Sequence, residues 1–71
     1  MRGGNSDLID LALVEHHRSD GAILVSEGGD RDKVVWLPLS LVDVEVLKGI
    51  RLPRPVEVTL PEWLAKDRGL I

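Results

Sequence analysis

The sequence predicts a mainly β fold, a five-stranded antiparallel meander that curls into a small open barrel and ends in one short C-terminal helix. Three observations support this class. Short stretches of alternating apolar and polar residues recur along the chain. Glycine- and proline-rich connections separate these stretches. The hydrophobic fraction, 44% of the residues, comes almost wholly from Val, Leu, Ile and Ala, and branched aliphatic side chains favour packed strands.

The length predicts a single domain, residues 1–71, with a thin core. A domain of this size buries roughly 60% of the surface that its unfolded chain exposes. Cysteine is absent, so neither disulfides nor thiolate zinc sites can stabilise the fold. Apolar packing must do so, and formation of a homodimer would help. We expect residues 1–6 to be flexible.

The predicted strands share one pattern, in which alternate side chains point to opposite faces. They lie at residues 8–15, 22–26, 33–37, 42–46 and 56–60. The connections between them are Asp20-Gly21, an exposed loop at 27–32, Pro38 with a short turn at 39–41, and a loop at 48–55. In the first strand Ile9, Leu11 and Leu13 share one face. Because the connections are short, we expect the strands to pair in chain order.

A change of period after the fifth strand predicts the helix. Pro61 suits a first helical turn, and the helix is expected to run to about Arg68. Leu60, Trp63 and Leu64 follow the i, i+3, i+4 spacing, so we expect Trp63 to anchor the helix on the sheet. Gly69 is expected to adopt the left-handed cap conformation, which lets the last two residues fold back in a Schellman arrangement.

Charge and hydropathy limit the classes of function. The net charge is −3, with nine acids and four bases in residues 1–45 but five bases and three acids in residues 46–71. An acidic total argues against a sequence-independent duplex binder, which needs a strongly basic face. No apolar run approaches the ~20 residues that cross a bilayer, and residues 1–5 do not begin a secretory signal. We therefore expect a cytoplasmic protein that does not contact membranes.

The residues that usually carry chemistry do not form a recognisable site. His16 and His17 are adjacent in a strand, so their side chains are expected to point to opposite faces rather than to one metal ion. Glu27, Asp30 and Asp32 do not match the twelve-residue calcium loop. No serine lies at a strand-to-helix elbow. The sequence thus predicts no enzyme, no metal and no cofactor.

Two sets of charged residues are candidates for binding a partner. The acids would imitate phosphate groups to a basic partner, whereas the bases would contact phosphates or an acidic protein surface. The acidic set is Glu27, Asp30, Asp32, Asp43 and Glu45, and the basic set is Lys48, Arg51 and Arg54. Trp36 is either a core residue or a stacking platform for a base. The strand at 42–46 is also a candidate protein-docking edge.

Two segments resemble a known group of proteins. They are Val35-Trp36-Leu37-Pro38-Leu39-Ser40 and the stretch from Val56 to Ile71, which includes Glu62-Trp63-Leu64-Ala65 and Gly69-Leu70. Together they resemble short phage and mobile-element proteins with a Trp-Leu/Ile-Pro-x-Ser strand end and a Glu-Trp-Leu-Ala...Gly-Leu tail. The similarity spans most of the chain from the first strand onward. The family has Lys or Arg between the Pro and the Ser, where this chain has Leu39.

This resemblance implies a phage-related context and a partner that is a host or phage macromolecular complex. In size and charge the chain is similar to anti-CRISPR proteins, an analogy of context rather than of motif. Such a protein would bind a CRISPR-Cas effector complex stoichiometrically and block target DNA binding. Two other hypotheses stay open, a small nucleic-acid-binding barrel in phage DNA metabolism and a structural homodimer.

Overall fold

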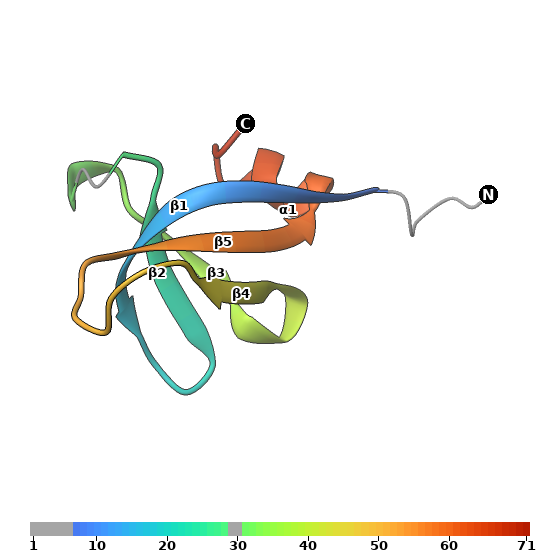
Figure 1. Cartoon of the computed structure of the whole chain (residues 1–71). Coiled ribbons are helices and arrows are strands. Elements are labelled where there is room, and N and C mark those ends of the chain that lie inside the picture. The colour runs from blue at the N-terminus through green and yellow to red at the C-terminus, as the bar shows by residue number, and fades with distance from the viewer. Residues whose placement is uncertain (1–6, 29–30) are drawn as a thin grey trace.

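A computed structural model describes residues 7–28 and 31–71 as one five-stranded antiparallel sheet followed by a short helix (Figure 1). The elements are β1 (Leu8–Arg18), β2 (Ala22–Ser26), η2 (Arg31–Lys33), β3 (Val35–Pro38), η3 (Leu39–Leu41), β4 (Asp43–Val46), β5 (Arg54–Pro61) and α1 (Glu62–Asp67). The two η elements are single 3-10 turns. The sheet does not close on itself, so the predicted mainly β class with an open barrel is confirmed. Residues 1–6 and Asp30 lie outside the described residues.

The strand order is β3-β2-β1-β5-β4. Consecutive strands pair as expected except at one place, because β3 and β4 are not neighbours. Pro38 and the 3-10 turn η3 separate these two strands. The two ends of the meander meet instead, since β1 and β5 pair without interruption from Leu8 opposite Pro61 to Glu15 opposite Arg54. The opening of the barrel therefore lies between β3 and β4.

β1 is longer than predicted and belongs to both halves of the sheet, the β3–β2–β1 half and the β1–β5–β4 half. Its first part lies beside β5, which in turn pairs with β4, and its last part pairs with β2 (Figure 1). The β1–β2 register shifts between Glu15 and His17, which is a β-bulge at His16. A bulge bends a strand and increases its twist. The bend coincides with the transfer of β1 from one half to the other.

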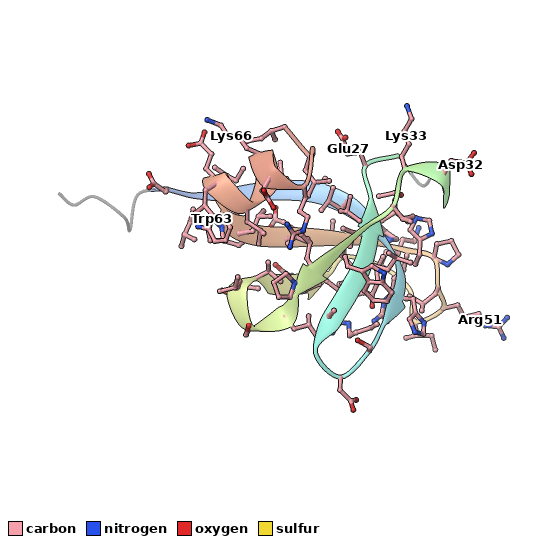
Figure 2. The ribbon with its side chains drawn as sticks, turned by 180° about the vertical axis from the view of Figure 1, so that it is seen from behind. Glu27, Asp32, Lys33, Arg51, Trp63 and Lys66 are labelled. Carbon is pink, nitrogen blue, oxygen red and sulfur yellow. The ribbon has the colours of Figure 1, made fainter. Side chains whose placement is uncertain are left out.

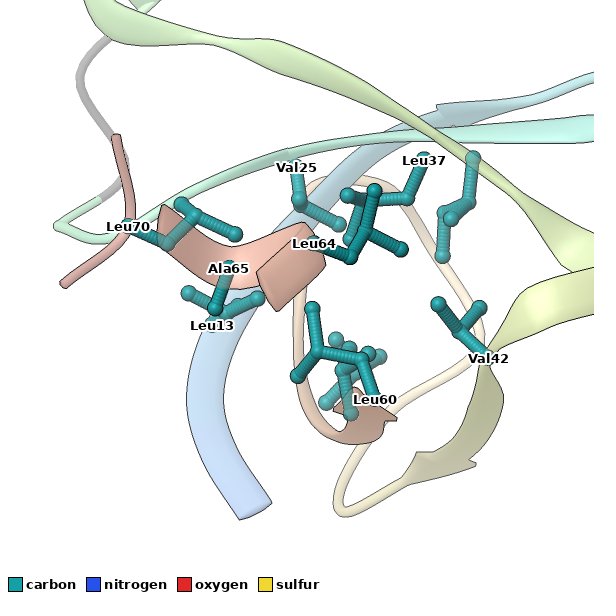
Figure 3. Packing of buried hydrophobic residues seen from close by; sticks show 11 residues of the cluster. Leu13, Val25, Leu37, Val42, Leu60, Leu64, Ala65 and Leu70 are labelled. Atoms are coloured by element: carbon teal, nitrogen blue, oxygen red, sulfur yellow. The ribbon is translucent and has the colours of Figure 1, made fainter. Parts of the chain in front are cut away.

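The core is wholly aliphatic and is enclosed by the curled sheet and α1 (Figure 3). Its members come from β1, β2, β3 and β5, from Val42 just before β4, and from the C-terminal segment. They are Leu13, Ile23, Val25, Leu37, Val42, Val56, Val58, Leu60, Leu64, Ala65 and Leu70. Both tryptophans lie outside this cluster, so aliphatic packing alone makes the core of the described chain.

The helix is anchored by different residues from those expected. Trp63 is 57% exposed, whereas Leu64 is 1% exposed and Ala65 is fully buried. The prediction that Trp63 docks the helix was therefore wrong. Leu60 belongs to β5, so the helical spacing cannot be counted through it. In Figure 3 Leu64 lies near the centre of the cluster, between Leu60 on one side and Val25 and Leu37 on the other.

The end of the helix confirms the predicted cap. Gly69 has φ +75°, in the left-handed region. The Gly69 N–H donates to the Lys66 carbonyl (3.1 Å) and the Leu70 N–H donates to the Ala65 carbonyl (2.8 Å), the two bonds of a Schellman motif. Leu70 then packs into the core. Within the described residues, no helix combines the length and apolar character that a membrane span requires.

Candidate functional site

Four exposed carboxylates lie together on the outer surface of the β1–β5–β4 half of the sheet. Directly paired residues share a face, and the register places Asp10 and Asp43 on either side of Thr59. One pleat along, Glu57 pairs with Glu45. We call these carboxylates the acidic face. Neighbouring strands are about 4.8 Å apart and alternate residues on a strand about 6.7 Å apart, so the four charges are close but do not converge.

Nothing in the described part of the chain neutralises the acidic face. None of its four carboxylates takes part in the ion pairs among residues 7–28 and 31–71. The Thr59 hydroxyl donates a short hydrogen bond to Asp10. Glu45 and Glu57 are directly opposite each other, and like charges in that arrangement destabilise a sheet. Over the same residues, no group of three or more potential ligands is arranged to hold a metal ion.

The remaining acidic candidates lie elsewhere. Glu27 and Asp32 are exposed beside the β2–β3 connection, on the other side of β1 in the strand order from β4. Figure 2 shows them near Lys33. The structure therefore separates them from Asp43 and Glu45 and does not support one continuous acidic patch. Asp30 lies outside the described residues.

The three basic candidates also separate. Lys48 and Arg51 are exposed on the loop between β4 and β5, and Arg51 projects from the surface in Figure 2. Arg54 opens β5 and its side chain is only 20% exposed. Its Nε donates to the Glu15 carboxylate at 2.9 Å. Only Lys48 and Arg51 of the expected basic set are thus directed to solvent.

Glu15 is a buried carboxylate held by two arginines. Its side chain is 0% exposed, and it accepts hydrogen bonds from Arg54 Nε (2.9 Å), Arg18 Nε (2.9 Å) and Arg18 Nη2 (3.2 Å). Burial, the largest single influence, raises the pKa of Glu15, but the hydrogen bonds and charges of the two arginines outweigh it. The pKa of Glu15 therefore lies below its ordinary value of 4.5. This cluster cross-links β1 to the start of β5 and is structural in character.

The two histidines beside the bulge in β1 contact different partners. His16 Nε2 lies 2.7 Å from Ser26 Oγ, and its Nδ1 is buried without a hydrogen-bond partner. His17 contacts Trp36 edge to face, with ring centroids 6.0 Å apart, across Leu24 of β2. Trp36 is 47% exposed, so it is not a core residue. An aromatic surface of this kind keeps the stacking hypothesis open.

Sequence reasoning missed Asp10 and Glu57 in the acidic face and missed the role of Glu15. Glu15 continues the inward series of Ile9, Leu11 and Leu13 at a period of two, and this alternation predicts that its side chain faces the core. The acidic face required knowledge that β1 pairs with β5, which no local pattern carries.

No protein family, curated protein or solved structure matches this chain.

Proposed function

We propose that this protein is a non-catalytic, phage or mobile-element binding protein that acts in the cytoplasm by stoichiometric association with a protein complex. In its sharpest form the proposal is an anti-CRISPR inhibitor, which binds a CRISPR-Cas effector and blocks its binding to target DNA. The observation that carries it is the acidic face, Asp10, Asp43, Glu45 and Glu57 on three adjacent strands, which forms no ion pair within residues 7–28 and 31–71.

The chemistry of that face suits a surface that normally binds nucleic acid. A DNA-binding channel is lined with Lys and Arg, which pair with a regular row of phosphates. Carboxylates spaced along a rigid sheet present negative charge to such a channel, as phosphates do. They need no conformational ordering on binding. The like-charge pair of Glu45 and Glu57 weakens the sheet. A binding role explains why two such acids stand opposite each other.

The test measures target DNA binding by purified CRISPR effector complexes of several types while the protein is titrated. Stoichiometric inhibition predicts that the loss of DNA binding saturates at a fixed molar ratio and that a complex is isolated by gel filtration. Inactivation by amounts far below the effector concentration would indicate turnover and contradict the proposal.

Matched charge-neutral variants locate the surface. The double variant Glu45→Gln with Glu57→Gln removes two charges from the acidic face, and we expect inhibition to weaken at least tenfold. Glu27→Gln with Asp32→Asn makes the same change in net charge beside the β2–β3 connection and should leave inhibition nearly intact. The reverse result would place the interaction at the β2–β3 connection and refute the acidic face.

One observation favours the alternative of a small nucleic-acid-binding barrel. Trp36 is exposed beside His17 on the outer side of β3, where a base can stack on its ring. The variant Trp63→Phe leaves Trp36 as the single tryptophan, so its fluorescence reports directly on a single-stranded oligonucleotide. Quenching that weakens as salt rises would support this alternative over inhibition if Trp36→Ala also loses binding, measured by the fluorescence anisotropy of a dye-labelled oligonucleotide.

A further inference from the structure

The outermost strands in the strand order are β3 and β4, and the β3 edge is blocked. In an antiparallel ladder, alternate residues of an edge strand direct both backbone groups away from the neighbouring strand. The Leu39 N–H donates to Gly21 across the end of the β2–β3 ladder (3.0 Å), so Trp36 and Pro38 are the outward-directed residues. Pro38 has no N–H to offer. The Trp36 carbonyl accepts a hydrogen bond from Arg68 Nε at 3.2 Å.

The β4 edge lacks both kinds of block. The Leu47 N–H donates to the Pro55 carbonyl at 3.0 Å, which continues the register of the β4–β5 ladder. By the same alternation, Val44 and Val46 direct their N–H and C=O groups away from β5. Within residues 7–28 and 31–71 no side chain forms a hydrogen bond with these backbone groups, as Arg68 does with the Trp36 carbonyl. The edge offers about four backbone hydrogen bonds, two for each residue.

The side chains of β4 define what can add to this edge. Val44 is half-buried and Val46 is 38% exposed on the inner face, beside the opening of the barrel. The outer face carries Asp43 and Glu45, with Glu57 behind them on β5. A complementary strand therefore needs aliphatic side chains on one face and cations on the other, in strict alternation.

A second copy of this chain does not meet that requirement. An antiparallel β4–β4 pair with Val44 opposite Val46 places Glu45 opposite Glu45, and one with Val44 opposite Val44 places Asp43 opposite Glu45. An in-register parallel pair places each acid beside its own copy. Like charges on directly opposite positions destabilise a strand pair. Self-association through this edge is thereby opposed, whereas a segment with Lys or Arg at alternate positions is attracted.

We propose that the β4 edge binds an extended segment of a protein partner, with Lys or Arg alternating with aliphatic residues, as a sixth strand of the sheet. This is strand addition, in which backbone hydrogen bonds provide affinity and alternate side chains provide specificity. The inference rests on the proposed function, because it describes how the acidic face engages its protein partner.

The first test uses a defined probe, an N-acetylated, C-amidated peptide of four Lys-Val repeats, and amide hydrogen exchange by NMR. At a peptide concentration ten times its Kd, we expect exchange at Val44 and Val46 to slow about tenfold. The Trp36 amide on the β3 edge is the internal comparison and should not change. A Glu-Val repeat and a peptide with four Lys followed by four Val are the matched controls for charge and for alternation.

Several outcomes would overturn the proposal. Absence of binding at millimolar peptide does so, and so does binding that leaves the Val44 and Val46 amides unprotected. Equal binding of the Glu-Val peptide would remove the charge argument. Protection of both amides in a dimer of the free protein would show that a second copy occupies the edge.

A second test separates this inference from the proposed function. Val46→Pro removes an outward N–H without breaking the β4–β5 ladder, and Val46→Ala shortens the same side chain while keeping the N–H. If the wild type binds an effector complex, Val46→Pro should bind at least tenfold more weakly than Val46→Ala. Equal binding of the two variants refutes strand addition while the proposed function stands. Absence of any complex with the wild type refutes the proposed function.

Discussion

Replacing Arg54 with alanine removes one of the two guanidinium groups that hold the buried Glu15 carboxylate. A hydrogen bond to a charged group contributes about 1.5–3 kcal/mol, and breaking a fully buried ion pair costs about 3–5 kcal/mol. Arg54 is 20% exposed and Arg18 continues to bond Glu15, so solvent and the second arginine offset part of the loss. We expect Arg54→Ala to lower the free energy of unfolding by about 2 kcal/mol.

That loss is large for this chain. A domain of 71 residues has a free energy of unfolding of about 4–11 kcal/mol. For domains of this size, 1 kcal/mol corresponds to about 4–8 °C in Tm, so the expected decrease is roughly 8–16 °C. Urea denaturation followed by circular dichroism measures the free energy, and thermal unfolding gives Tm. Arg51→Ala is the matched control, because Arg51 is exposed on a loop. Its free energy of unfolding should stay within about 0.5 kcal/mol of the wild-type value.

The difference between wild type and Arg54→Ala should depend on pH. The folded-state pKa of Glu15 lies below its ordinary value of 4.5, so the carboxylate contributes stability above about pH 4.5. This contribution is lost as the pH falls through the folded-state pKa. The two unfolding free energies should therefore converge under strongly acidic conditions. A decrease for Arg54→Ala no larger than that for Arg51→Ala, or one independent of pH, would refute a stabilising role for this cluster.

Three further predictions concern stability. Leu64→Ala removes a buried core side chain and should cost about 2–5 kcal/mol, whereas Trp63→Ala, at an exposed position, should cost less than about 1 kcal/mol; equal losses would restore Trp63 as the anchor. Gly69→Ala places a Cβ on a residue in the left-handed region, so thermal unfolding should show a loss of about 1 kcal/mol in the free energy of unfolding. Gly21→Ala, at a residue without positive φ and with nothing near its Cβ, should be close to neutral. Glu45→Lys replaces a like-charge cross-strand pair with an attractive one, so chemical denaturation should report a gain of roughly 0.2–1 kcal/mol, and a loss would contradict the assigned register.

Much of the fold could be predicted because its signals are local. The second strand was located at its observed limits, residues 22–26, and the turn at 39–41 is a 3-10 turn. The cap at Gly69 followed from one residue type and its position after a helix. The limits of β1 and β5 extend beyond the predicted ones, because Arg18 pairs with Ile23 past the bulge at His16 and Arg54 pairs with the distant Glu15.

The candidate site was predicted only in part. Asp43 and Glu45 follow from the alternation within one strand, and both are exposed as expected. Arg54 has the same side chain as Arg51 and lies three residues away, yet it turns inward because Glu15 is there to receive it. Burial of a charged group depends on its partner, and the partner lies 39 residues earlier in the chain.

Local sequence signals were sufficient for the class of the fold, the central part of each strand, the turns and the manner in which the helix ends. Each of these depends on side-chain periodicity or on the backbone preferences of glycine and proline, which act over a few residues. The tertiary fold alone sets the pairing of β1 with β5 and the opening of the barrel between β3 and β4. It thereby gathered four carboxylates on one surface, buried Glu15 and left both tryptophans outside the core. These outcomes require contacts between residues far apart in the chain, such as Asp10 and Thr59 at a separation of 49, and their energies depend on the environment that folding creates.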